Sequence, residues 1–250
     1  MRAAAGTGII ITTSTITPMA DAALYDLMTW MSPSWPIGAF AHSGGLEWAV
    51  DAGHVKDRQT TREWIAALIG HGAIHNDAVL FVHAWRASEA RDAGRLREIV
   101  ELAAASQTGY ERRLEATAQG AAFRRIAGTS IQENEDFTSL LSSIDDDDLA
   151  YPIATAALFA IHGIGLKQGL TAWLHGMVAN LVSAAQRLVP LGQTDGQRVL
   201  RDLREQIFAA VETAAALPDD DPFDAMGGAA LVAELGCMAH ETQYTRLFRT

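Results

Sequence analysis

The segment Ser32–Glu47, with the sequence SPSWPIGAFAHSGGLE, constrains the fold of this chain more than any other. Pro33 and Pro36 each fix φ near about −65° and disfavour the α-helical region for the residue before them. Gly38 and Gly45 allow backbone angles and close approaches that other residues do not adopt. Because the segment also carries several apolar residues, it is predicted to be shaped and packed, unlike a flexible linker.

Composition sets the protein class. The chain has 250 residues, of which 49% are hydrophobic and 20% charged, enough for one domain with a sizeable core. Its formal net charge of −11 argues against a nucleic-acid-binding surface. Two acidic runs, Asp145–Asp148 and Asp219–Asp221, are expected to be solvated loops, since neither has the alternating ligands and glycine of a calcium loop.

Cysteine content and hydropathy indicate the cellular compartment of the protein. The single cysteine, Cys237, excludes an intramolecular disulfide and a zinc site built from several cysteines. No uninterrupted apolar run reaches the ~18 residues of a transmembrane helix. Residues 1–20 hold one arginine and a short apolar patch rich in Thr and Ser, a poor match to a signal peptide. We therefore expect a flexible N-terminal arm at 1–20, no membrane partner and a cytoplasmic protein.

Apolar residues recur with helical spacing along most of the chain. Pro152 suits the first turn of one helix, while Thr60–Glu63 and Thr194–Gln197 have the spacing of a capping box. The expected helices cover 21–31, a stretch starting at 60, 98–127 with an interruption at 106–109, a stretch near 152, 173–188, 194–216 and 229–239. Residues 128–148 read as an exposed loop. We predict an all-α, single-domain bundle of roughly eight to ten helices over 21–240.

Two motifs are candidate sites of chemistry. His71 and His75 are four residues apart and would share one face of a helix. A third ligand is poorly placed, because Asp77 points about 200° away from His75 and His83 lies two turns on. Gly163–Gly169 lacks a preceding strand and the GxxxxGK[ST] pattern of a nucleotide loop, so a turn between helices is favoured. We predict no catalytic residue and no cofactor, with a helical metal-dependent enzyme using the two histidines as the alternative.

Two polar segments are candidate interaction sites. Arg187, Gln193 and Gln197 flank a turn that contains Pro190, and they either bind a partner or stabilise the turn. The final segment is rich in Tyr, Phe and Arg, types enriched at interfaces. It is either a partner-binding tail over 241–250 or a frayed end. The two alternatives are compatible if the tail is disordered when free and becomes ordered when a partner binds. The predicted partner-binding residues there are His240, Glu241, Tyr244, Arg246, Leu247, Phe248 and Arg249.

Three separated blocks resemble the UreF family of urease accessory proteins. They are the SP, PIGAF and SGGLE pieces of the first segment, the stretch 183–197 with PLGQ and GQ, and the HE…YTRLFR ending. Their order and spacing extend the resemblance from about residue 21 to 250. The residues of the first block expected to form a structural motif are Pro33, Pro36, Gly38, Phe40, Ser43, Gly45 and Glu47.

The resemblance implies an all-α homodimer that takes part in nickel insertion and urease maturation without catalysis. Its implied partners are the UreD/UreH scaffold, the GTPase UreG and apo-urease, and it would modulate the GTPase. Because the sequence contains no phosphate-binding loop, the nucleotide site would lie on the partner. A structural interaction module unrelated to urease would explain the tail but leave the first block unexplained.

Overall fold

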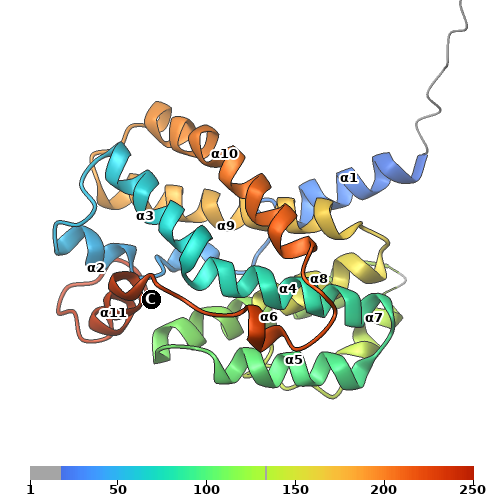
Figure 1. Ribbon diagram of the computed structural model, residues 1–250. Helices are drawn as coiled ribbons and strands as arrows, with labels where there is room; N and C mark the ends of the chain where they lie inside the picture. Colours follow the sequence, from blue (N-terminus) through green and yellow to red (C-terminus); the bar gives the residue numbers. More distant parts are fainter. Residues whose placement is uncertain (1–17, 133) are drawn as a thin grey trace, which may run out of the picture.

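The computed structural model describes residues 18–132 and 134–250, and within these ranges it contains only helices (Figure 1). The elements are α1 (Pro18–Trp30), η1 (Ala39–Ala41), α2 (Leu46–Asp51), α3 (Arg58–His71), α4 (Ala73–Glu89), α5 (Ala93–Ala105), α6 (Tyr110–Ser130), α7 (Glu135–Leu140), α8 (Tyr151–Ile161), α9 (Leu166–Leu188), α10 (Gln193–Ala215), η2 (Pro222–Ala225) and α11 (Leu231–His240). The predicted all-α, single-domain bundle is confirmed. The described part holds eleven α-helices, more than expected because α2 and α7 are only six residues long.

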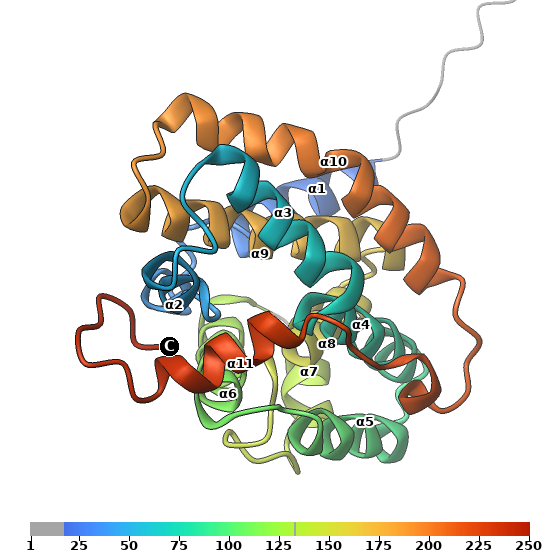
Figure 2. The ribbon, with the colours of Figure 1, turned by 60° about the vertical axis from the view of Figure 1, so that its left-hand side comes forward.

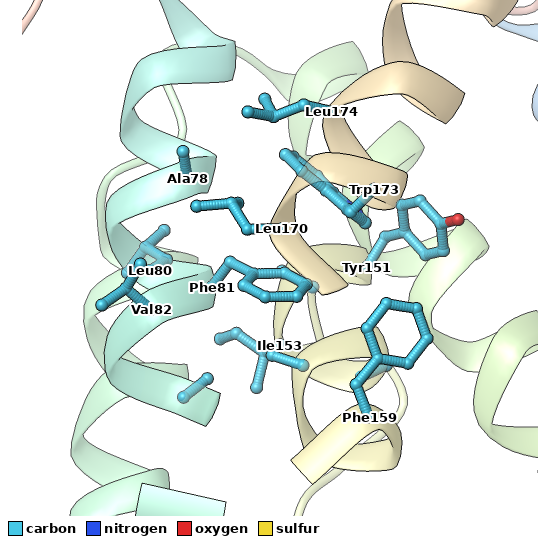
Figure 3. Close-up of a cluster of buried hydrophobic side chains, with 14 of the residues drawn as sticks. Ala78, Leu80, Phe81, Val82, Tyr151, Ile153, Phe159, Leu170, Trp173 and Leu174 are labelled. Atoms are coloured by element: carbon cyan, nitrogen blue, oxygen red, sulfur yellow. The ribbon is translucent and has the colours of Figure 1, made fainter. Parts of the chain in front are cut away.

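Helix α4 forms the centre of the bundle and contacts α3, α5, α8, α9 and α10. Helix α8 is nearly all apolar because it lies between α4 and α6. The ring of Phe81 in α4 lies 6.0 Å from Phe159 in α8 and 5.8 Å from Trp173 in α9, centroid to centroid (Figure 3). Such aromatic contacts add to the hydrophobic burial that holds the three helices together.

Several helix starts differ from the prediction. Helix α3 begins at Arg58 because Asp57 is its N-cap and exchanges hydrogen bonds with Thr60, so the capping box lies three residues earlier than expected. Helix α10 follows Gly192 with no side-chain cap, and Thr194 lies inside the helix. The predicted break at 106–109 and the place of Pro152 in the first turn of α8 are confirmed.

The loop and terminal predictions fare differently. Residues 128–148 are not one loop, since they include the end of α6 and all of α7. Positions 1–17 of the expected N-terminal arm lie outside the described residues, and 18–20 already belong to α1. No single described helix is long and apolar enough to cross a bilayer; α3 and α4 meet those criteria only as a pair bent by 41°.

The proposed pairing of His71 and His75 on one helix is wrong. Gly72 separates α3 from α4, so His71 ends one helix while His75 lies in the next and hydrogen-bonds the carbonyl of Ala225. Over 18–132 and 134–250, no three His, Cys, Asp or Glu side chains are grouped to hold a metal ion. The spacing of two histidines on one helix, on which the alternative metal-dependent enzyme depended, is therefore not observed.

Candidate functional site

Arg187, near the end of α9, contacts parts of the other two sequence blocks. Its Nη1 donates to the carbonyl oxygen of Phe40 over 2.7 Å. Its guanidinium carbon also lies 4.2 Å from the centre of the Phe248 ring, an attractive cation–π arrangement. Three blocks that are far apart in the sequence therefore meet at one place in the fold.

Glu47 in α2 is the main anchor of the tail, which we define as residues 241–250. The backbone N–H of Leu247 donates to its Oε1 over 2.6 Å, and that of Phe248 to its Oε2 over 2.8 Å. The Nε2 atom of His240 lies 3.2 Å from the same Oε2. Glu47 is only 7% exposed, and these donors replace the water that a buried carboxylate loses.

His240, the last residue of α11, also reaches α6. Its Nδ1 lies 2.6 Å from Oε2 of Glu111, while Nη1 of Arg246 lies 2.7 Å from Oε1 of the same carboxylate. Glu241 accepts a 3.3 Å hydrogen bond from the backbone N–H of Glu111. One carboxylate on α6 therefore binds the end of α11 and the middle of the tail.

The last two residues pair with the loop before α2. Ser43 donates to the carbonyl oxygen of Thr250 from its backbone N–H over 2.7 Å and from its hydroxyl over 3.0 Å. Arg249 in turn donates its N–H to the carbonyl of Ala41. His42 lies beside them, with Nδ1 2.7 Å from the Thr250 hydroxyl. Burial and the Arg249 charge lower the pKa of His42 to about 4, so the ring is neutral near pH 7.

Gly45 lets this loop pack tightly on α11. Its φ is +80°, and a Cβ placed there would lie 2.8 Å from Sγ of Cys237. Gly236, beside that cysteine, faces the Trp48 ring, which its own Cβ would meet at 2.6 Å. Glycine is needed at both positions because no side chain fits between α2 and α11. Gly38 also has a positive φ, +77°, but nothing lies close to it.

A second buried charge cluster adjoins the site, and sequence reasoning missed it. Arg112 in α6 forms an ion pair with Asp77 in α4. Burial raises the pKa of Glu115, whose Oε2 has no hydrogen-bond partner among the described residues. Arg112, Glu115 and Cys237 line one cavity of ≈40 Å³. Burial also raises the pKa of Cys237, to about 12. The sequence signal that could have indicated this cluster is the placement of charged residues on one face of an otherwise alanine-rich helix.

The tail is packed onto the body and yet presents apolar side chains. Phe248 is buried, whereas Tyr244 is fully exposed and Leu247 is 64% exposed. The described contacts fix the backbone of the tail beside α2 and α6, next to α11, so the tail is not a frayed end (Figure 2). Exposed apolar residues continue along one face of α11. We name the α11–tail surface after these residues, Leu231, Leu235, Met238, Tyr244 and Leu247.

Other predicted site residues lie apart from this cluster. Gln193 and Gln197 are exposed on the first turns of α10, where Gln193 accepts a 3.2 Å hydrogen bond from Gln186. Pro33 and Pro36 are exposed in the turn after α1. The cluster therefore joins chain segments that are far apart in the sequence and presents a surface.

Comparison with known proteins gives one consistent result. The family model described as UreF matches residues 55–204. The urease accessory protein UreF of Rhodopseudomonas palustris (strain BisB5) is 46% identical over 232 residues, covering 92% of each chain. Proteins of the same name from Bradyrhizobium diazoefficiens and Bradyrhizobium sp. (strain BTAi1) are 44% and 45% identical, covering 92–94% of this chain and 92–95% of their own.

Proposed function

Because this chain belongs to the UreF family of urease accessory proteins, we propose that it acts in nickel insertion and maturation of urease as an adaptor. It is an accessory protein and not an enzyme. In this proposal it joins the UreD/UreH scaffold, the GTPase UreG and apo-urease in the cytoplasm, works as a homodimer and modulates the GTPase. The nickel is cargo of the assembly.

The observation that carries the proposal is the anchored tail. Buried contacts to Glu47 and Glu111 hold the tail in place, while Tyr244 and Leu247 face outward. Large apolar side chains on a fixed backbone lose little conformational entropy on binding and so favour tight docking. We assign the α11–tail surface to the scaffold partner.

We assign the region of Arg187 to homodimer formation or GTPase recruitment. Arg187→Ala is expected to weaken one of these at least about tenfold, since interface arginines commonly contribute more than 1 kcal/mol. Arg187 itself is exposed, and its internal contacts are one hydrogen bond to Phe40 and one cation–π contact with Phe248, so the loss of unfolding free energy should be about 1 kcal/mol. Size-exclusion chromatography with light scattering, and pull-down with the GTPase, measure the binding effect.

Arg198→Ala is the matched control, because Arg198 is also exposed and, among the described residues, pairs with Asp195 alone, one turn away. It should leave dimerisation and recruitment unchanged. Normal dimerisation, recruitment and urease activation in Arg187→Ala would remove Arg187 from the proposed interface.

The adaptor proposal also predicts how nucleotide binding responds. Calorimetry of the chain alone with GTP or GDP should show no binding, because organised phosphate donors belong to the partner. Adding the chain should change the GTPase's nucleotide affinity by about 5–150-fold, the range of typical allosteric coupling. This requires the chain to bind one nucleotide state of the partner better than another.

The separate arms of this experiment have separate meanings. A micromolar GTP site on the isolated chain would contradict the adaptor role. Equal nucleotide affinities of the partner with and without the chain would contradict modulation of the GTPase, although docking itself would still be measured by the pull-down.

A further inference from the structure

The cavity of ≈40 Å³ beside the Arg112 cluster lies beneath α11. Arg112 and Glu115 of α6 and Cys237 of α11 line it, and its other walls come from α3, α4, α9 and the loop before α2. Helix α11 turns small residues such as Ala233 toward this space, while its large apolar side chains face outward. Side chains therefore do not fill the joint between α6 and α11.

One oxygen of the buried Glu115 carboxyl group faces this cavity. Glu115 is only 4% exposed, and its Oε1 accepts a 3.4 Å hydrogen bond from Nε2 of Gln119. Its Oε2 has no hydrogen-bond partner among the described residues. A Cβ placed on Gly44, which also lines the cavity, would lie 3.9 Å from this Oε2. A buried polar atom in such a position costs free energy unless a hydrogen-bonding group reaches it.

The neighbouring arginine does not satisfy this oxygen directly. Nη1 of Arg112 lies 3.9 Å from Oε2 of Glu115, which is too long for a hydrogen bond. Arg112 already pairs with Asp77, so Glu115 is an additional acid in the cluster, and burial raises its pKa. A polar separation of this length leaves room for a bridging water molecule. Water suits either form of the acid, because it donates to a carboxylate and also accepts from a protonated carboxyl group.

We propose that the cavity is an internal hydration site that joins α6 to α11. An internal water needs about 10–15 Å³ of such space, so a cavity of ≈40 Å³ holds about three water molecules. Polar partners for them line the walls: Oε2 of Glu115, the guanidinium of Arg112, the hydroxyl of Thr108 and the thiol of Cys237. Since only the thiol belongs to α11, the water molecules connect that helix to α6 and the loop before it. The competing state is a dry cavity, which purely apolar walls would favour.

Nuclear Overhauser effects between water and methyl groups test this on the full chain, deuterated and labelled at its Ile and Ala methyl groups. Ile74 and Ala233 line the cavity, so their methyl groups should show cross-peaks to water. Ile153 and Ala154 are matched controls that are fully buried in α8, away from the cavity, and should show none. The ratio of rotating-frame to laboratory-frame effects separates long-lived internal water from surface water.

Two variants test the part played by the acid. Glu115→Gln keeps a polar group at the cavity and should retain the cross-peaks, whereas Glu115→Met makes this wall apolar and should lose them. The Asp77–Arg112 pair stays balanced in both variants. Absent internal-water cross-peaks at Ile74 and Ala233 in the wild type, or wild-type cross-peaks in Glu115→Met, would overturn the proposal. If Glu115→Met does not fold, the wild-type spectrum still decides between a hydrated and a dry cavity.

Discussion

Replacing Tyr244 and Leu247 together by alanine is expected to lower the affinity for the proposed partner, the UreD/UreH scaffold, about 100-fold or more. Tyr244 is fully exposed and Leu247 is 64% exposed, so neither stabilises the free chain through burial. Truncation of a hot-spot residue costs about 2 kcal/mol or more, and tyrosine is enriched among hot spots. Surface changes of this kind shift the unfolding free energy by about 0.5 kcal/mol or less. Calorimetric titration of the scaffold and urea denaturation measure the two quantities.

Phe223→Ala is the matched control, since Phe223 is an aromatic residue on η2 that is 66% exposed. It should leave scaffold affinity unchanged. Deleting Gln243–Thr250 should also abolish the complex with helical content nearly intact, but it removes the amide bonds to Glu47 as well. The double alanine variant therefore separates docking from anchoring. Wild-type affinity in that variant would exclude the tail from the scaffold interface.

Glu47→Ala is expected to have the largest effect on stability, a loss of about 3–5 kcal/mol in the free energy of unfolding. Removing one partner of a buried charge cluster leaves the others desolvated and unpaired. Here the unpaired groups are the amides of Leu247 and Phe248 and the His240 ring. Urea denaturation at constant pH measures the loss, and hydrogen exchange should show an unprotected tail.

Glu98→Ala is the corresponding control. The Glu98 side chain is 67% exposed, and its one ion pair within the described part of the chain is with Arg95, one turn away on α5. Exposed pairs of this kind contribute about 0–1 kcal/mol. A Glu47→Ala protein as stable as this control would mean that the tail is not anchored by the Glu47 carboxylate.

Periodicity was sufficient to predict most helices, because burial of one face acts on every helical turn. Periodicity did not predict the helix correctly where a glycine inside the helix is required for close packing against a neighbouring side chain. Gly169 was read as part of a turn, yet it lies in α9, where a Cβ would meet the Phe159 ring at 2.8 Å. Gly72 has the opposite effect: it ends α3 within a stretch that the histidine spacing had suggested was one helix.

The candidate site was only partly predictable for a different reason. Tyr, Arg and Phe in the tail carry a compositional signal for binding, and the pattern around Glu47 marked a shaped segment. The link between them runs through the backbone amides of Leu247 and Phe248. Nearly every residue has a backbone N–H, so the residue types of the tail do not indicate which amides bind Glu47. The buried charges of α6 were missed because a helical surface also carries Glu and Arg.

The anchor at Glu47 also has a consequence for how the chain is made. Its amide donors lie 200 and 201 residues further along the chain. At about 5–20 residues per second, a ribosome needs about 10–40 s to synthesise that length. During this time the Glu47 carboxylate can only be hydrated, and α2 lacks its contacts with α11 and the tail. The first segment to carry a recognisable motif is therefore among the last to reach its final structure, and a nascent chain exposes it throughout synthesis.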